Sequence, residues 1–136
     1  MKNREILAIV EARPGFLSAT GHSLPVEHFY KFVKFKRAVR KAWDAISKAQ
    51  NDFIGEIGID INDFRSPEKI PVDKATRYSA MNGALLDEEA EMPTVAKIPI
   101  ECYKGFYDEN RTENGDLFAD IVVENIILEN LFSEEE

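Results

Sequence analysis

The longest regular pattern of apolar residues in this chain lies between Pro25 and Ile54. Neither Gly nor Pro interrupts residues 26–54, and apolar side chains recur there three and four positions apart. The recurring residues are Phe32, Phe35, Val39, Ala42, Ile46, Ala49 and Phe53. Because this spacing places them along one face of an α-helix, we predict one long helix over about 25–54. At about 1.5 Å per residue, this helix would be about 45 Å long and would run through the whole domain.

Shorter apolar patterns on either side predict three further helices, over residues 3–12, 72–86 and 117–132. Gly83 weakens the second of these, and the β-branched residues of 121–128 leave a strand as the alternative within the third. Additional apolar residues widen the apolar face of the long helix: Phe29, Val33, Trp43 and Ile54. A face this broad favours packing inside a domain over a two-stranded coiled coil.

Alternating apolar residues predict a small two-stranded sheet. Isoleucine occupies every second position of residues 57–61, a pattern typical of a short strand. Residues 94–101 are rich in β-branched side chains, but Pro93 and Pro99 cannot donate hydrogen bonds to a sheet, so this second strand would lie at an edge. The two strands could pair with each other. The predicted fold is therefore a mainly helical α+β domain with one long central helix, shorter helices and this small sheet.

Composition adds limits to this picture. The chain has 136 residues and 44% hydrophobic content, which suits a single domain over residues 1–136 with its own core. We expect only the acidic end, residues 133–136, to fray. No apolar run reaches the roughly 20 residues that span a bilayer, and charges interrupt the apolar residues near the start, so we expect a soluble, unprocessed protein without membrane contact. The single cysteine, Cys102, excludes an intramolecular disulfide and favours a reducing cytoplasm.

Charge is distributed unevenly along the chain, whose formal net charge is −8. Residues 28–43 contain six basic residues and no acidic one, a net charge of +6. From Asp87 to the end, fifteen acidic residues stand against three basic ones, a net charge of −12. Such asymmetry favours electrostatic pairing, either within one fold or between subunits.

Two groups of charged residues are therefore candidate partner-binding sites. The first is the basic face of the long helix, formed by Lys31, Lys34, Lys36, Arg37, Arg40 and Lys41. The second is an acidic cluster formed by Asp87, Glu88, Glu89 and Glu91. We favour pairing of the basic residues with an acidic protein surface, either on the same chain or on a neighbouring copy. The alternatives are contact with nucleic-acid phosphates and a merely solvated basic face.

Motifs for catalysis or metal binding are missing from the sequence. His22 and His28 are six positions apart and straddle the start of the long helix, so they do not share a helical face as paired zinc ligands do. Cys102 lies in an apolar context with no local signature of a catalytic base. A calcium loop beginning at Asp60 would lack its glycine and its final glutamate. We therefore expect no enzymatic activity, no metal and no cofactor.

Two segments resemble a group of small phage and prophage proteins of unassigned function. The first, "SLPVEHFYKFVKFKRAVRKAWDAI", is similar to the start of their long helix, where "LP" precedes a helix rich in Tyr, Lys and Arg. The second, "YSAMNGALLDEEAEMPTVAKIPIECY", is similar to their Leu-Leu pair, acidic cluster and "IP" before a short final segment. The resemblance covers most of residues 20–105 and carries over no catalytic residue.

The resemblance implies a phage context, located in the host cytoplasm or in the virion. Within it, we predict a structural or assembly protein that acts through protein–protein contacts, as a homo-oligomer or with other phage proteins. One alternative is an anti-defence inhibitor that binds a host protein or its signalling nucleotide. The other alternative is an accessory protein that binds nucleic acid through the basic residues of 31–41.

Overall fold

The structure is a mainly helical α+β fold, described here by a computed structural model for residues 1–12, 14–112 and 115–133. Its α-helices are α1 (Asn3–Glu11), α2 (Val26–Ile57), α3 (Val72–Asp87), α4 (Tyr103–Glu109) and α5 (Ile121–Leu131). Its short 3-10 helices are η1 (Phe16–Ser18), η2 (Ile61–Arg65), η3 (Pro67–Lys69) and η4 (Ile100–Cys102). Its strands are β1 (Ile98–Pro99), β2 (Arg111–Thr112), β3 (Gly115–Asp116) and β4 (Phe132–Ser133). None of the helices in these ranges is long and apolar enough to cross a membrane.

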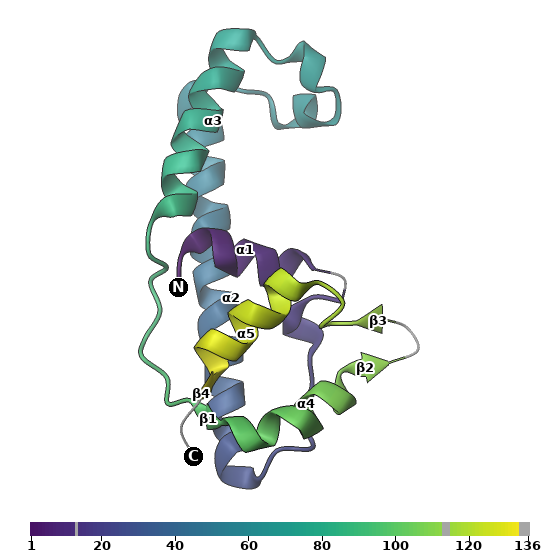
Figure 1. The fold of residues 1–136 in the computed structure, drawn as a ribbon. Coiled ribbons are helices and arrows are strands. Elements are labelled where there is room, and N and C mark those ends of the chain that lie inside the picture. Colours follow the sequence, from purple (N-terminus) through teal and green to yellow (C-terminus); the bar gives the residue numbers. More distant parts are fainter. Residues whose placement is uncertain (13, 113–114, 134–136) are drawn as a thin grey trace.

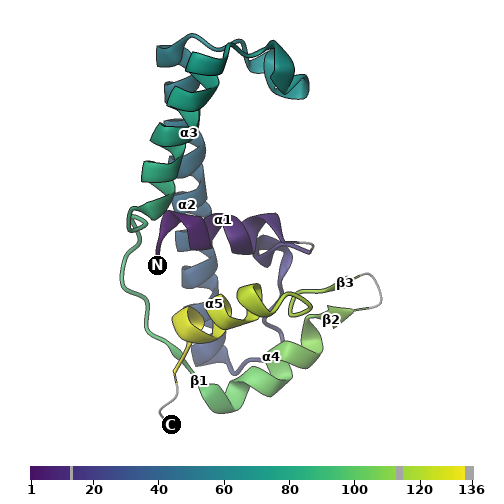
Figure 2. The ribbon, with the colours of Figure 1, turned by 45° about the horizontal axis from the view of Figure 1, so that its top comes forward.

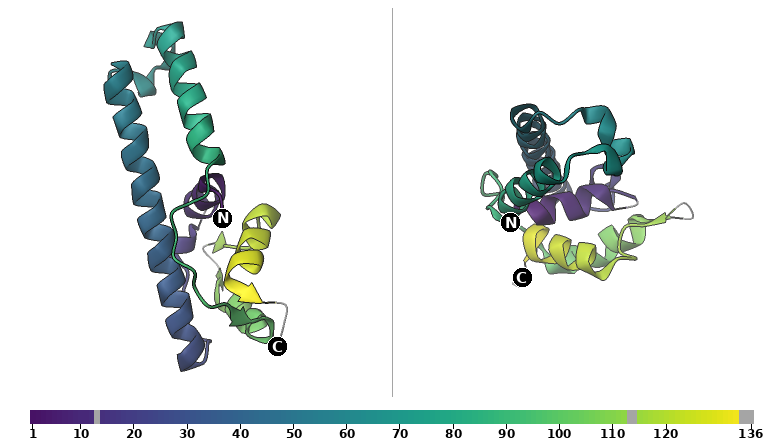
Figure 3. Two further views of the ribbon diagram at one scale, coloured as in Figure 1. Left: turned by 90° about the vertical axis from the view of Figure 1, so that its left-hand side faces the viewer. Right: turned by 90° about the horizontal axis from the view of Figure 1, so that it is seen from above.

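The long helix predicted from the heptad pattern is confirmed. α2 has 32 residues and runs through the whole length of the molecule (Figures 1 and 3). It begins after Pro25, whose missing N–H is not needed in the first turn, and ends at Gly58. Gly58 has φ 81°, a left-handed conformation that glycine adopts without a steric penalty, and its N–H bonds the carbonyl of Ile54.

The predicted strand over residues 57–61 is wrong. Ile57 is the last residue of α2, and Ile61 begins η2, so the alternating isoleucines span a helix end and a turn. The predicted partner strand over 94–101 is also shorter, at Ile98–Pro99, and it pairs in parallel with Phe132–Ser133. A second pair joins β2 and β3 in antiparallel fashion.

The remaining helix predictions are confirmed with small changes in their ends. α1 and α3 match the predicted ranges closely, whereas α5 begins at Ile121, four residues later than the predicted 117. Asp120 sets this start because its carboxylate accepts a 2.9 Å hydrogen bond from the N–H of Val122. The strand alternative for 121–128 is wrong. Ser133 belongs to β4, and the other residues of the predicted acidic tail, 134–136, lie outside the described residues.

The molecule consists of a body and an arm. In the body, α1, α4 and α5 lie on one side of α2, beside its N-terminal half (Figures 1 and 3). Several phenylalanines of this core touch edge to face, such as Phe32 with Phe16 and with Phe106, at centroid distances of 6.0 and 5.5 Å. The heptad face is buried in the body: Phe32, Phe35, Val39, Ala42 and Ile46.

The arm, defined here as residues 47–87, extends away from the body. It consists of the C-terminal part of α2, the antiparallel helix α3 and the connection between them, which turns to one side at the tip (Figures 2 and 3). Gln50 of α2 donates a 2.9 Å hydrogen bond to Asn82 of α3. The heptad residues Ala49 and Phe53 are only half-buried here, and α3 contributes no buried side chain.

Candidate binding site at the basic stretch of α2

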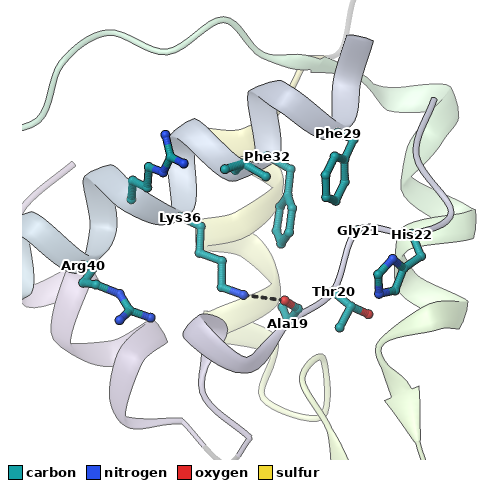
Figure 4. A pocket seen from close by; sticks show the side chains of 10 residues that line it. Ala19, Thr20, Gly21, His22, Phe29, Phe32, Lys36 and Arg40 are labelled. Carbon is teal, nitrogen blue, oxygen red and sulfur yellow. Dashed lines mark hydrogen bonds between the residues drawn. The ribbon is translucent and has the colours of Figure 1, made fainter. Parts of the chain in front are cut away.

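Three of the six predicted basic residues line a pocket on one side of α2. The pocket has a volume of about 560 Å³ and lies between α2 and the segment Ala19–His22. Lys36, Arg37 and Arg40 contribute its positive charge. Figure 4 shows Lys36 and Arg40 towards one end of the pocket and the rings of Phe29 and His22 towards the other.

The other three basic residues do not line this pocket. Lys31 donates a long, 3.4 Å hydrogen bond to the carbonyl of Lys97, in the segment that leads to β1. Lys34 places its ammonium 4.4 Å from the centre of the Tyr30 ring, a cation–π contact at the surface. Lys41 is exposed. The predicted basic face is thus divided between a pocket and the open surface.

Aromatic side chains form the apolar part of the pocket. Phe32 is 3% exposed, which places it at the floor, whereas Phe29 is 38% exposed. The rings of His22 and Phe29 are nearly parallel, with an angle of 17° between their planes and 6.5 Å between their centroids. The pocket therefore offers exposed ring surface at one end and cationic groups at the other.

The segment Ala19–His22 forms one wall of the pocket, and residues at the end of α4 hold this wall in place through hydrogen bonds. The Glu109 carboxylate accepts from the Thr20 hydroxyl and from the backbone N–H groups of His22 (2.8 Å) and Ser23 (2.6 Å). Asn110, which is 7% exposed, accepts from the N–H of Thr20 and donates to the Thr20 carbonyl, each at 3.0 Å. These bonds fix residues 20–23 through two residues that do not line the pocket.

Lys36 holds the same wall from the side of α2. Its ammonium donates a 2.8 Å hydrogen bond to the carbonyl of Ala19 (Figure 4). Partial burial, together with repulsion from Arg40, lowers the pKa of Lys36. The pocket therefore places two positive groups close together in a partly desolvated environment.

Glu109 carries the opposite charge but does not line the pocket. Burial alone would raise its pKa, but the hydrogen bonds from Thr20, Ser23 and His22 outweigh burial and leave the pKa below its ordinary value. The carboxylate is thus held ionised by these hydrogen-bond donors.

Among the residues that the structure describes, none of the six basic side chains forms an ion pair, and no carboxylate lines the pocket. Pairing of the basic stretch with acidic residues of its own chain is therefore not observed in that part of the molecule. Pairing with a neighbouring copy stays a prediction.

The predicted acidic cluster lies at the end of α3, and two of its members are engaged within the chain. Asp87 forms a 2.7 Å ion pair with Arg4, which lowers the pKa of Asp87. Glu89 pairs at 3.1 Å with the amino group of Met1. Glu88 and Glu91 are exposed. These two ion pairs therefore connect the first residues of the chain with the end of α3.

The remaining candidates for catalysis or metal binding, the two histidines and Cys102, lie in different environments. His22 lies in the pocket, whereas His28 is partly buried with its Nε2 3.6 Å from Glu27. Over the described ranges, no group of three or more His, Cys, Asp or Glu side chains is placed to hold a metal ion. Burial, followed by the Glu101 carboxylate, raises the pKa of Cys102, which favours the unreactive thiol.

Comparison with known proteins finds no match: no family model fits the sequence, and no curated protein or solved structure is significantly similar to it. The resemblance to small phage proteins is therefore not tested by these comparisons.

Proposed function

We propose that this protein is a phage-type structural or assembly protein that acts through protein–protein contacts and forms a homo-oligomer by pairing arms. The observation that carries the proposal is the incomplete burial of the arm. A helical hairpin with apolar residues on both helices needs further contacts to bury them, and the arm of a second copy would supply these contacts in a four-helix bundle.

Several apolar side chains are exposed together at the tip of the arm. Val72 is 81% exposed at the start of α3, and Ile61 is 62% exposed in η2. Phe64 is 38% exposed, although its ring contacts that of Tyr78 edge to face at 5.5 Å. Grouped apolar exposure of this kind is typical of an interaction surface.

The net charge of the arm opposes pairing with a second arm only weakly. The arm, residues 47–87, contains five basic and seven acidic residues, a net charge of −2, so two arms would repel each other little. The remaining parts of the chain are far from neutral, because residues 1–46 carry nine basic and four acidic residues, a net charge of +5. The arm is therefore the part of this chain best suited to contact its own copy.

The two helices of the arm also carry opposite charges, although the Lys74 ammonium donates one 2.9 Å hydrogen bond to the carbonyl of Gly58. Asp52 and Glu56 lie on α2, and Lys74 and Arg77 lie on α3. None of these four side chains forms an ion pair within the described part of the chain. In a two-fold pair, α2 of one copy would face α3 of the other, so that acidic and basic side chains would meet twice.

Light scattering after size exclusion tests the proposal, with charge-swapped arms as the decisive variants. We expect the wild type to be at least a dimer at about 100 μM, and Asp52→Lys with Glu56→Lys to weaken self-association by about ten-fold through like-charge contacts. Arg77→Glu should weaken it as well. A mixture of the two variants should associate, because each then offers the charge that the other lacks.

The control changes the same charge outside the arm, with Asp44→Lys and Asp108→Lys, both at exposed positions. It should leave the oligomer unchanged. A wild type that is strictly monomeric at high concentration, or a control that dissociates as readily as the arm variants, would refute the pairing of arms.

The phage context is supported by the resemblance of the segments that begin at Ser23 and Tyr78. Neighbouring genes provide its test. We expect genes for virion or assembly proteins beside the gene for this chain, and a cluster of genes against host defences would favour the inhibitor instead.

A further inference from the structure

We infer that the pocket beside α2 binds a free nucleotide, with phosphate groups against Lys36, Arg37 and Arg40 and the base against Phe29 and His22. This function goes beyond assembly and does not depend on it, because the pocket lies in the body and the proposed contact lies in the arm. Three features of the pocket carry the inference: its cationic side chains, which form no ion pair within the described residues, its exposed rings and its fixed wall.

The charged end of the pocket suits phosphate. Arg37 and Arg40 can each offer two parallel N–H donors, the geometry that phosphate oxygens accept best. Lys36 uses one donor for the Ala19 carbonyl and keeps two others. Since no carboxylate lines the pocket in the described part of the chain, a bound anion would relieve the repulsion between Lys36 and Arg40.

The opposite end suits a flat ring. Phe29 and His22 are both exposed and nearly parallel, so a base can lie against ring surface that is otherwise in water. Stacking on aromatic side chains accepts any base, because every base has a π-face. Val33 and the buried Phe32 complete an apolar floor on which a base and ribose can rest.

The volume of the pocket and the separation of its aromatic and cationic ends fit a small ligand. Its volume of about 560 Å³ lies within the range of roughly 300 to 1,000 Å³ that is usual for small-molecule sites. Phe29 and Arg40 are eleven residues apart, about 16 Å along the axis of α2, which suits a base followed by several phosphates. The wall is held by Glu109 and Asn110 in the free protein, so little order has to be created on binding.

Isothermal titration calorimetry of the full chain tests the inference, with ATP as the probe and no added divalent metal. Adenosine and inorganic triphosphate report on the two ends of the pocket separately. We expect saturable ATP binding that weakens as salt rises, and binding at least ten-fold weaker for each of the two fragments.

Variants assign the binding to the pocket. Arg37→Gln with Arg40→Gln should weaken ATP binding at least ten-fold and leave adenosine binding unchanged, whereas Phe29→Ala should weaken ATP and adenosine but leave inorganic triphosphate unchanged. The matched control is Lys34→Gln with Lys41→Gln, which removes the same charge from positions on α2 that do not line the pocket. It should change ATP affinity by less than about three-fold, and an unchanged unfolding midpoint shows that each variant is folded.

The inference is overturned if ATP shows no saturable binding at millimolar concentration, or if the control weakens binding as much as the pocket variants do. It is also overturned if a single-stranded oligonucleotide or an acidic peptide binds through Arg37 and Arg40 while ATP does not compete. These results would assign the pocket to a nucleic acid or to a protein partner, respectively.

Discussion

Replacing Gly21 by alanine should destabilise the body and disturb the wall of the pocket. A Cβ atom at Gly21 would lie 2.7 Å from Cδ1 of Phe32 and 3.2 Å from side-chain carbons of Leu24 and Phe29. A carbon contact of 2.7 Å is too short to persist, so something must move. Phe32 cannot turn away easily, because it is 3% exposed and packs edge to face against Phe16 and Phe106.

The expected loss of stability in Gly21→Ala follows from overpacking of the core. Adding a methyl group to a filled core costs about 1 to 3 kcal/mol, and the buried position of Phe32 places Gly21→Ala in the upper half of that range. Strain in the backbone is not the cause, since Gly58 is the glycine with positive φ in the described part of the chain. For a domain of this size, about 2 kcal/mol corresponds to a melting temperature lower by about 6 to 10 °C.

Gly83→Ala provides the matched control. It lies inside α3, and an added Cβ would meet no atom within 4 Å. Alanine there removes the conformational cost of glycine in a helix and should stabilise the protein by about 0.5 to 1 kcal/mol. Urea unfolding followed by circular dichroism measures both variants. Equal stability of Gly21→Ala and wild type would refute the close packing of the wall against Phe32.

Two further predictions concern the buried face of α2 and the hydrogen bonds by which Glu109 holds the wall of the pocket. Phe35→Asp places an unpaired charge at a position that is 4% exposed, so the variant should be insoluble or unfolded, and an unchanged melting temperature would show that the heptad face is misassigned. Glu109→Gln should be less stable than wild type at pH 7, because the folded-state pKa of Glu109 is lowered and its contribution is present above the unfolded pKa of about 4.3. That contribution is lost as the pH falls through the folded pKa. Urea unfolding should therefore show a smaller difference in stability between wild type and Glu109→Gln at pH 3.5 than at pH 7. A difference in stability that does not depend on pH would contradict the role of the Glu109 carboxylate in holding the wall.

The long helix could be predicted from sequence because its pattern is local and extends over many turns. The error at 57–61 also has a local cause. Isoleucines at every second position are typical of a strand. Gly58, however, ends α2 there with a left-handed conformation. The sequence alone does not distinguish a glycine within a strand from a glycine at a helix end. The pairing of β1 with β4 was not predictable, because Ile98 and Phe132 are far apart in the chain.

The candidate site was predictable in its charges but not in its shape. The basic residues stand out in the sequence, and helical geometry could have separated Arg37 and Arg40 from Lys34. The wall could not be found in this way, because Thr20 and Asn110 are 90 positions apart and no sequence pattern connects them. Only the folded chain brings His22 beside Phe29.

The order of contacts along the chain has a consequence for biosynthesis. The arm joins α2 to the next helix, α3, so it can form as soon as Asp87 has left the ribosome. The body cannot, because its first helix, α1, packs against its last, α5. During translation, the nascent chain therefore presents a finished arm beside an open core, and two neighbouring nascent chains could meet through their arms before either body has closed.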